Sequence, residues 1–303
     1  MGNTFFFAWE PELMIWLQSH LGDFGLGLMS FFSLFGEELL LVLVMGFCYW
    51  AYDKELGKAI GRNVCVVSMG FPLIKNVALR LRPYMVCPGV KCLKPVDPQA
   101  DIMDLAAQGY SFPSGHSSGS VAAYGSLALY EKHKWVKVLG VALPLLVGIS
   151  RFCVGVHFPT DVLAGWALGL VVVLLLPRVQ GLFSRRWVFY GVILLLALPG
   201  WFYCQTDDYY TSFGMAAGFF AADLFEERFV RFTGTRTPWK MAVRVLGGVG
   251  IYLGLNTLCK LPFSPAFLAS GSFPAHLIRT LRYGLILFVD VGLYPLAFQK
   301  LKF

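Results

Sequence analysis

The sequence has few charged residues for its length. Charged side chains make up 14% of the 303 residues, whereas 57% are hydrophobic and 16% are aromatic. Soluble domains carry about 25% charged residues, and a globule of this size has too little interior to bury so much apolar surface. This composition excludes a disordered chain, a cytosolic enzyme and a small secreted module. Together with a mean hydropathy of +0.63, it indicates a polytopic membrane protein.

Signals for several other classes of protein are also missing. The seven cysteines include no CxxC pair and no Cys/His metal spacing, so neither a zinc site nor a disulfide framework is predicted. Cys87 and Cys92 share one loop and can pair only if that side of the membrane is oxidising. The first twenty residues lack a basic region before an apolar stretch, and we therefore expect no removable signal peptide. Basic residues are scattered rather than grouped with aromatics, so the net charge of +7 does not indicate nucleic-acid binding.

Long apolar runs predict nine membrane spans, because each span needs about 20 apolar residues. Before these runs, Glu10-Pro11-Glu12 is typical of a helix start. Residues 1–23 are therefore expected either to lie on the bilayer surface as an interfacial segment or to form a plain tail. The fold class predicted is all-α, a polytopic membrane helix bundle. The nine runs cover residues 26–50, 59–79, 115–130, 135–155, 158–177, 187–204, 209–225, 241–259 and 277–298.

Basic residues are distributed unevenly among the predicted connections. The N-terminus and the turn at Asp207-Asp208 have none. Because basic residues mark the cytoplasmic side of a membrane protein, we expect the N-terminus outside and the C-terminus in the cytoplasm. The basic connections are 53–62, 131–137, 178–186, 226–240 and the C-terminal Lys300 and Lys302.

A few basic residues break this pattern. Lys75 lies near the end of the second predicted span, where a charge costs about 2.5–3.5 kcal/mol and normally faces a partner or a cavity. Lys75 and Arg82 are seven residues apart, which places them nearly on one helix face, and Pro83 ends that helix. Taken alone, both residues fit snorkelling toward the membrane edge better than a site. Arg80 has a different helical angle and is interpreted as a snorkelling residue.

Three separate stretches reach the same outer face in this topology. Their identity played no part in deriving the topology, so their convergence is independent evidence for a site. They are Lys75-x6-Arg82-Pro83, Ser111-Phe112-Pro113-Ser114-Gly115-His116 and Ser150-Arg151-x5-His157-x3-Asp161.

The first chemistry that these stretches offer is phosphate binding. Ser114 and Gly115 open the third predicted span, where free backbone N–H groups and the positive helix end attract an anion. Glycine at this point lets the backbone approach the ligand closely. The positive charges of Lys75, Arg82 and Arg151 add to this attraction, and each arginine can grip two oxygens at once.

The second chemistry is nucleophilic catalysis by histidine. His157 and Asp161 are spaced i and i+4, so the carboxylate can hold one imidazole nitrogen and leave the other nucleophilic. His116 is then available as a general acid. A lone HxxxD pattern is common, and the combination with the other two stretches gives it weight.

The order and spacing of the motifs resemble the type 2 phosphatidic acid phosphatase superfamily. Its three signatures, KxxxxxxRP, PSGH and SRxxxxxHxxxD, are present without departure at any defining position. The resemblance covers about residues 24–205 and implies a six-helix phosphatase core there. Residues 206–303 are then expected to form a C-terminal extension of about three transmembrane helices.

The resemblance implies a role for each matching residue. His157 would attack phosphorus and become a phosphohistidine, Asp161 would orient it, and His116 would protonate the leaving alcohol. Positive charge would stabilise the transition state. The resemblance implies neither a metal nor another cofactor. The phosphoryl oxygens would be held by Lys75, Arg82, Ser114, Gly115 and Arg151.

Other charged residues allow two interpretations each. Glu37 and Glu38 either line the substrate cavity as a second tier, one of them pairing with Lys75, or mark a kinked helix whose carboxylates reach water. The loop 84–112 is either a lid over the site or a solvated acidic loop. Asp223 and Asp290 lie within predicted spans of the extension and either function there or pair with neighbouring helices.

The function expected from these observations is a metal-independent membrane phosphatase acting on a lipid phosphate monoester or diphosphate. A site at headgroup level can accept a substrate sideways from the bilayer, so the expected partners are that substrate and membrane lipids, with no nucleic acid. The oligomeric state is not predicted. The short N-terminus and compact loops favour a bacterial inner membrane, with the site facing the periplasm or cell exterior.

Two other functions remain open. Nine spans with this orientation also resemble glucose-6-phosphatase, which would make the substrate a soluble sugar phosphate. A protein of another class, an anion transporter or channel, would bind the anion without cleaving it. The pair of histidines with Asp161 argues against that class, because binding alone does not require them.

Overall fold

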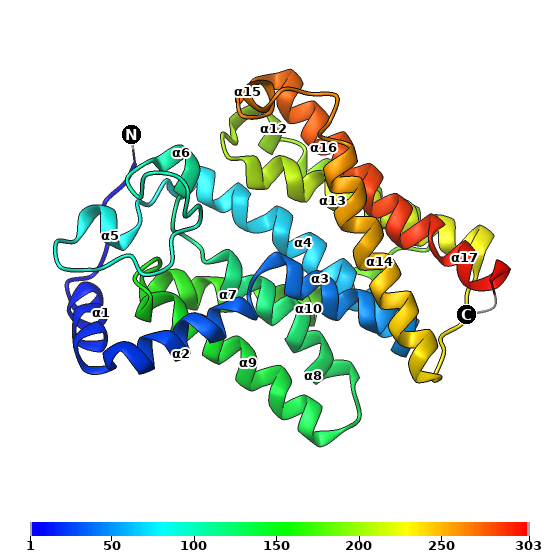
Figure 1. Ribbon diagram of the computed structural model, residues 1–303, viewed down its shortest axis with the longest axis horizontal. Coiled ribbons are helices and arrows are strands. Elements are labelled where there is room, and N and C mark those ends of the chain that lie inside the picture. The colour runs from blue at the N-terminus through cyan, green and yellow to red at the C-terminus, as the bar shows by residue number, and fades with distance from the viewer. Residues whose placement is uncertain (1, 302–303) are drawn as a thin grey trace. The chain divides into compact units, whose positions relative to one another are not determined.

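The computed structural model describes residues 2–301, which fold mainly into helices (Figure 1). Within these residues the β structure is limited to one isolated bridge, between Asn3 and Arg80. The all-α class expected from the sequence is therefore confirmed.

The described chain divides into two compact units. The first contains the residues up to Leu41 together with Gly70–Leu174, and the second contains Val42–Met69 together with the residues from Leu175 onward. Helices α3, α4 and α10 each contribute residues to both units. The boundaries of these units differ from the expected boundaries at residues 24 and 206. The division into an N-terminal segment, a six-helix core and a C-terminal extension stays a prediction.

The first unit is built around helix α9. This helix packs against α2, and also against the continuous segment formed by α7, η2 and α8. Gly140 lies directly against the backbone of Tyr124, so only glycine permits this close approach of α9. The helices that lie wholly in the unit are α1 (Trp9–His20), α2 (Gly22–Leu34), α5 (Pro83–Val86), α6 (Leu105–Gln108), α7 (Gly115–Ser120), the π-helix η2 (Val121–Gly125), α8 (Ser126–Tyr130) and α9 (Lys134–Cys153).

The helices shared by the units are α3 (Glu38–Phe47), α4 (Lys54–Ala78) and α10 (Pro159–Gln180). Helix α3 is bent by 50° relative to α2, at a break that contains Gly36 and Glu37. A sharp bend of this kind needs a local cause, and the glycine supplies one. The range 26–50, expected to be one span, is therefore two helices joined by a bend.

The second unit is organised around α13. Helix α16 packs along it at very short range, because Gly214 and Gly218 lie directly against the backbone of Thr280 and Gly284. The elements of this unit are the π-helices η1 (Cys48–Tyr52), η3 (Glu226–Val230) and η4 (Phe288–Leu293), with α11 (Arg186–Ala197), α12 (Gly200–Tyr203), α13 (Asp207–Phe225), α14 (Pro238–Leu258), α15 (Pro265–Leu268), α16 (Phe273–Leu287) and α17 (Pro295–Lys300).

A buried ionic network lies within the second unit. Nζ of Lys58 is 3.0 Å from Oδ1 of Asp223 and 2.8 Å from Oε2 of Glu226. Asp223 also accepts a hydrogen bond from the hydroxyl of Tyr190. The Asp223 carboxylate therefore pairs with neighbouring helices, which is one of the two interpretations expected for it.

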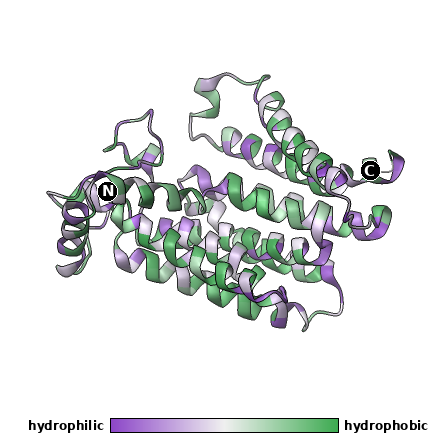
Figure 2. Cartoon of the chain, turned by 60° about the horizontal axis from the view of Figure 1, so that its bottom comes forward, coloured by the Kyte–Doolittle hydropathy of each residue, from purple (hydrophilic) through white to green (hydrophobic). Residues whose placement is uncertain are grey.

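The chain is an integral, multi-pass membrane protein. Five helices are long and apolar enough to cross a membrane, and the bent pair at Gly22–Leu34 and Glu38–Tyr52 makes up to six. Apolar residues cover much of the length of the long helices (Figure 2). Helices also occupy the other three predicted ranges, but α4 carries several charged residues, α7 to α8 is interrupted by a π-helix, and α13 begins with two aspartates. The expected count of nine spans is thus higher than the count that length and hydropathy support.

Candidate functional site

The three sequence motifs meet in the first unit. Helix α4 carries Lys75, Arg82 precedes α5, and α7 begins with Gly115 and His116. Arg151 lies in the last turn of α9, and His157 lies in the short connection to α10. The buried members of the set are Lys75, Arg82, Ser114, Arg151, His157 and Asp161.

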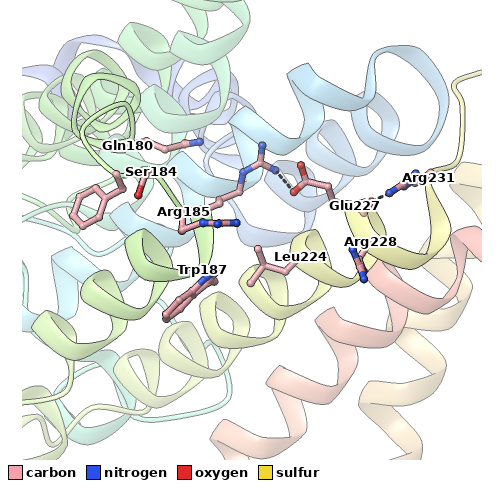
Figure 3. Close-up of a pocket in the computed structure, with 10 residues that line it drawn as sticks. Gln180, Ser184, Arg185, Trp187, Leu224, Glu227, Arg228 and Arg231 are labelled. Atoms are coloured by element: carbon pink, nitrogen blue, oxygen red, sulfur yellow. Dashed lines mark hydrogen bonds and ion pairs between the residues drawn. The ribbon is translucent and has the colours of Figure 1, made fainter.

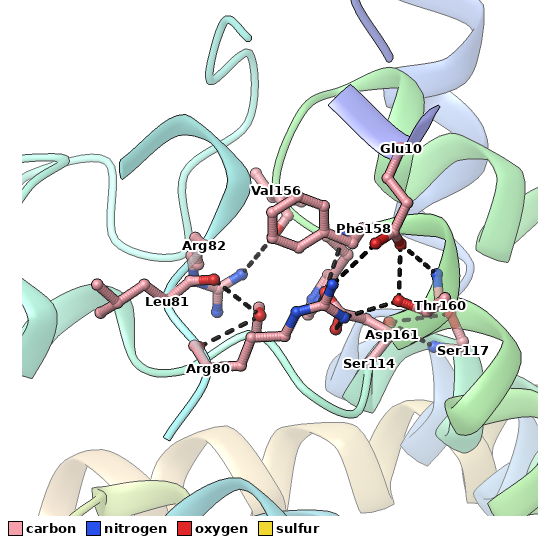
Figure 4. Close-up of polar contacts among 12 residues, drawn as sticks. Glu10, Arg80, Leu81, Arg82, Ser114, Ser117, Val156, Phe158, Thr160 and Asp161 are labelled. Atoms are coloured by element: carbon pink, nitrogen blue, oxygen red, sulfur yellow. Dashed lines mark hydrogen bonds and ion pairs between the residues drawn. The ribbon is translucent and has the colours of Figure 1, made fainter. Parts of the chain in front are cut away.

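Ser114 forms the N-cap of α7. Its hydroxyl oxygen accepts hydrogen bonds from the backbone N–H of Ser117 at 3.3 Å and from the Ser117 hydroxyl at 2.9 Å. Its own backbone N–H donates to the carbonyl oxygen of Asp161 at 3.0 Å. The PSGH motif is thereby fixed against the first turn of α10 (Figure 4). The expected helix start at this serine matches the observed one.

Gly115 allows close contact at the same turn. A Cβ atom on this residue would lie 3.0 Å from the ring of Phe71 on α4. Nζ of Lys75 lies 5.1 Å from the centroid of the same ring, in a cation–π contact. The motif glycine and the motif lysine therefore share one aromatic neighbour.

His157 and Asp161 face each other across the first turn of α10. Nδ1 of His157 lies 3.6 Å from Oδ2 of Asp161 and has no hydrogen-bond partner among the described residues. Catalytic hydrogen bonds are often this loose before substrate binds. Burial, together with the nearby Arg82, Arg151 and Lys75, lowers the pKa of His157 well below its ordinary value. The imidazole is therefore neutral at pH 7, which is the form that a nucleophile needs.

The two motif arginines are held in different ways. Nη1 of Arg151 donates to the hydroxyl of Ser33 on α2, and its buried Nε has no partner among the described residues. Nε of Arg82 donates to the carbonyl oxygens of Gln108 and Gly109 at 2.9 and 3.0 Å, and Nη1 donates to Val156 at 2.9 Å. Arg82 thus orders the backbone on two sides of the site in addition to supplying charge.

Glu37 lies at the break between α2 and α3. Its Oε1 atom is 2.6 Å from Nζ of Lys94, in the long loop 84–112. The structure therefore has the kinked helix that was one of the interpretations for the pair of glutamates. The sequence predicts no role for Lys94, because the residues around a basic loop residue do not indicate which acidic residue it pairs with. A cavity role for Glu37 and Glu38 stays a prediction.

Helix α1 contacts the loop 84–112 and the end of α9. Nε2 of Gln18 on α1 donates to the carbonyl oxygens of Lys91 and Cys153, at 2.9 and 3.1 Å. Met14 packs fully buried in a cluster with Cys87, Val90 and Phe158. Helix α1 is thus packed within the first unit. Its Trp9 and Trp16 are exposed, and contact of this helix with the bilayer surface stays a prediction.

Arg80 corrects one sequence interpretation. It is 2% exposed and does not snorkel to the membrane edge. Its Nη1 atom donates to Oδ1 of Asp161 at 2.6 Å, and Nη2 donates to Oε2 of Glu10 at 3.0 Å (Figure 4). The snorkelling interpretation was wrong because both partners are distant in the sequence. From the sequence, Glu10 is assigned only to the start of a helix. The one signal that could have identified it as a site residue is that charged residues are scarce in this chain.

The cysteines and acidic residues form neither a disulfide nor a metal site within residues 2–301. All seven cysteines lie within the described residues, and none of them forms a disulfide there, including the pair Cys87 and Cys92. Residues 2–301 contain no group of three or more His, Cys, Asp or Glu side chains placed to hold a metal ion.

Comparison with known proteins agrees with the motifs. Residues 55–185 match the PAP2 superfamily, and residues 210–303 match the transmembrane extension of PAP2 superfamily phosphatases. No solved structure is significantly similar to the chain.

Several characterised proteins are similar to parts of the chain. An undecaprenyl-diphosphatase of Sulfolobus acidocaldarius is 30% identical over 145 residues, which is 47% of this chain and 65% of that protein. Phosphatidylglycerophosphatase B of Bacillus subtilis is 43% identical over 72 residues, 21% of this chain and 36% of that protein. A lipid A 1-phosphatase of Rhizobium johnstonii is 37% identical over 91 residues, 30% of this chain and 34% of that protein.

The matches thus span less than two thirds of each of these relatives. The PAP2 superfamily match at residues 55–185 includes all three motifs, and the separate match at residues 210–303 continues in the same superfamily. The chain belongs to the PAP2 superfamily.

Proposed function

We propose that the chain is a membrane phosphatase that hydrolyses a lipid phosphate monoester or diphosphate through a phosphohistidine, without a metal. The observation that carries this proposal is the buried imidazole of His157. One of its nitrogens faces Asp161 at 3.6 Å, and burial, together with the positive charges of Arg82, Arg151 and Lys75, lowers its pKa.

In the first step, His157 is the nucleophile. With its Nδ1–H directed at Asp161, the Nε2 atom carries the lone pair and attacks phosphorus. An N–P bond forms while the bond between phosphorus and the leaving oxygen breaks. His116, protonated once the negative charge of the bound substrate offsets the surrounding cations, donates a proton to that oxygen. The surrounding cations stabilise the negative charge on the phosphoryl oxygens in the transition state.

In the second step, water replaces the histidine. His116, now neutral, accepts a proton from the water as its oxygen attacks phosphorus. The N–P bond breaks, inorganic phosphate forms, and both histidines return to their starting states. The same cations serve both steps, because the phosphoryl group stays in place.

The substrate class is proposed from two lines of support. The three relatives are named for different substrates, undecaprenyl diphosphate, phosphatidylglycerophosphate and lipid A, all of which are lipid phosphates. The chain is also a multi-pass membrane protein, which gives a lipid direct access from the bilayer. The choice among phosphatidic acid, phosphatidylglycerol phosphate, sphingoid base phosphates and polyprenyl phosphates is left to experiment.

The proposed orientation places the site outside the cytoplasm, with the N-terminus outside and the C-terminus inside a bacterial inner membrane. The basic residues of the connections at 53–62 and 178–186 support it. A single cysteine introduced at Asp101, in the loop 84–112, should react with an impermeant maleimide in intact cells. Labelling only after lysis would reverse the orientation.

A phosphate-release assay on the purified protein tests the activity. The panel contains the lipid phosphates above and glucose 6-phosphate, and it compares wild type with His157→Ala, His116→Ala and the exposed control His133→Ala. We expect release from at least one lipid by wild type and the control, with loss in the other two variants. Preference for glucose 6-phosphate would replace the lipid class, and anion movement in liposomes without any hydrolysis would indicate a transporter.

Two further measurements test the mechanism. After a rapid quench with radiolabelled substrate, wild type should carry an acid-labile, alkali-stable phosphoryl group that His157→Ala lacks. EDTA should leave the rate unchanged. Loss of activity in EDTA that magnesium restores would overturn the metal-independent mechanism, and full activity of His157→Ala would overturn the nucleophile.

A further inference from the structure

Arg80 has a buried guanidinium with every nitrogen engaged. Nε donates to the carbonyl oxygen of Phe5 at 2.8 Å, and Nη1 donates to Oγ1 of Thr160 and Oδ1 of Asp161 at 2.7 and 2.6 Å. Nη2 donates to Glu10 at 3.0 Å. The group is also covered by the ring of Phe158, 4.2 Å away. A cation placed in this way is oriented by the protein and is not a phosphate ligand.

Glu10 is the second member of the same network. Its side chain is fully buried. Oε2 accepts from Arg80 and, at 2.8 Å, from the backbone N–H of Phe7, while Oε1 accepts from the backbone N–H and the hydroxyl of Thr160 at 3.0 and 2.7 Å. The carboxylate thus joins α1 to the first turn of α10, which is the turn that carries Asp161.

The contacts of Arg80 determine how Asp161 meets His157. Oδ1 of Asp161 is taken by Arg80, and Oδ2 accepts from the backbone N–H of Phe158 at 2.7 Å. These two donors hold the carboxylate plane of Asp161 (Figure 4). They leave Oδ2 at 3.6 Å from Nδ1 of His157. Charges therefore alternate along the chain of contacts from Glu10 through Arg80 to Asp161.

We propose that Glu10 and Arg80 are positioning residues, which act on His157 through Asp161. The inference rests on the proposed phosphatase function and deepens it. Arg80 fixes the carboxylate that selects the tautomer of the nucleophile, and Glu10 fixes Arg80 and offsets its charge, so that Asp161 stays able to hold a histidine that becomes positively charged. The N-terminal segment is then part of the catalytic apparatus.

The test compares Glu10→Gln with Glu12→Gln, an exposed glutamate in the same turn of α1. A misplaced catalytic group costs up to about 100-fold in rate, so we expect kcat to fall about 10- to 100-fold in Glu10→Gln with KM within about twofold. Glu12→Gln should keep both constants. Equal kcat values in the two variants would overturn the proposal, as would a loss confined to KM.

A milder variant covers the case in which Glu10→Gln does not fold. Thr160→Val removes one hydroxyl that bonds both Glu10 and Arg80, and it should lower kcat less than Glu10→Gln while the protein stays folded. The rate of phosphoenzyme formation in a single turnover should fall in parallel. If wild type releases no phosphate, the proposed function has failed; if wild type is active and Thr160→Val matches it in both rates, only this inference has failed.

The second unit contains a cavity of about 710 Å³ (Figure 3). Its lining includes four arginines, Arg185, Arg186, Arg228 and Arg231. Arg186 is held by Glu227 at 3.0 Å and by Asp223 at 3.3 Å, and Nε of Arg231 donates to the carbonyl oxygen of Glu227 at 3.0 Å. Arg185 and Arg228 form no ion pair with any residue in 2–301. The lining therefore carries an excess of positive charge that the protein itself does not neutralise.

Apolar side chains stand exposed beside this cavity. Trp187 in its lining is 64% exposed, and Leu182 and Phe229, next to lining residues, are 82% and 67% exposed. The connection that supplies Arg185 joins two candidate spans, so it lies at a membrane surface. Basic pockets between helices at such a surface bind anionic lipid headgroups. The preference for basic residues on the cytoplasmic side of a membrane explains why arginines occur in these connections. It does not explain why four of them line one cavity.

We infer that this cavity binds the phosphodiester headgroup of an anionic membrane lipid. The guanidinium groups of Arg185 and Arg228 would grip phosphate oxygens, and the exposed tryptophan would lie among the acyl chains. The site is independent of the catalytic motifs, and it gives the C-terminal extension, which supplies Arg228 and Arg231, a role in lipid recognition.

Native mass spectrometry with added phosphatidylglycerol tests this site. The double variant Arg185→Gln with Arg228→Gln is compared with Lys132→Gln plus Arg236→Gln, which makes the same charge change at exposed residues outside the cavity. We expect at least fivefold weaker lipid retention in the first pair only. Equal retention in both pairs would overturn the inference, and so would displacement of the lipid by soluble glycerophosphoglycerol at similar concentrations, which would identify a soluble ligand.

Discussion

Lys94 and Glu37 form an ion pair in which Nζ lies 2.6 Å from Oε1. The pair fastens the loop 84–112 to the break between α2 and α3. Its side chains are 25% and 41% exposed, and partly exposed pairs contribute about 0.2–1 kcal/mol. Such a contact is too weak to hold the fold but strong enough to set how often the loop opens.

Lys94→Gln should therefore loosen the loop without unfolding the protein. We expect proteolysis within 84–112 to rise about twofold to fivefold, which is the change in an opening equilibrium that up to about 1 kcal/mol produces. The midpoint of thermal unfolding should stay the same. Lys91→Gln is the matched control, since Lys91 is an exposed lysine of the same loop that forms no ion pair with residues 2–301. Equal cleavage of both variants would contradict the fastening role.

Gly36 lies against the proposed general acid. A Cβ atom at this residue would be 2.7 Å from Cγ1 of Val147 and 3.0 Å from Cβ of His116. Gly36→Ala should thus displace His116 and lower kcat, with about 1–3 kcal/mol of overpacking strain. Gly27→Ala on α2 is the control, because nothing lies within 4 Å of its Cβ position. Phosphate release and thermal unfolding measured on both variants check this, and a fully active Gly36→Ala would show that the histidine has room to move.

The sequence predicted the parts of the site whose determinants are local. Ser114 was expected to begin a helix because Pro-Ser-Gly is a local signal, and it does cap α7. His157 and Asp161 were expected to meet because i and i+4 residues are neighbours on a helix, and they face each other at 3.6 Å. Residues of this kind need no knowledge of the tertiary fold.

The parts that were missed depend on contacts between distant segments. Arg80 is 70 residues from Glu10 and 81 from Asp161, and no helical spacing connects them. The bend at Gly36 and the π-helix at 121–125 follow from packing and not from hydropathy, which is why apolar runs alone gave nine straight spans. Lys94 was overlooked for the same reason, since its partner lies 57 residues earlier.

Lys58 neutralises two buried carboxylates in the second unit. Its side chain is 3% exposed, and Asp223 and Glu226 are fully buried. Removing one partner of a buried pair costs about 3–5 kcal/mol, because an uncompensated charge is left behind. Lys58→Met should therefore lower the unfolding midpoint in detergent by roughly 10 °C, whereas Lys132→Met, at an exposed lysine, should leave it unchanged. Adding Glu226→Gln to Lys58→Met should recover part of the loss, and an unchanged midpoint for Lys58→Met would show that water reaches the carboxylates.

The depressed pKa of His157 makes the stability of the protein depend on pH. Burial first, and then Arg82, Arg151 and Lys75, disfavour the imidazolium in the folded state, whereas the unfolded chain binds a proton at the ordinary value of about 6.5. Below that pH the unfolded state holds more protons, so stability falls as pH falls, by at most about 1.4 kcal/mol per pH unit. Above about pH 7 neither state is protonated, and the effect vanishes.

His157→Gln isolates this contribution. Thermal unfolding in phosphate-free detergent buffer between pH 7.5 and 5.5 should show a smaller decline in midpoint for His157→Gln than for wild type, because the variant has no imidazole to protonate on unfolding. His133→Gln, at an exposed histidine, should decline as wild type does. Parallel curves for all three proteins would mean that His157 is as easily protonated in the folded state as in the unfolded chain. The imidazole would then be largely cationic at mildly acidic pH, and the surrounding arginines could not be close enough to hold a phosphoryl group beside it.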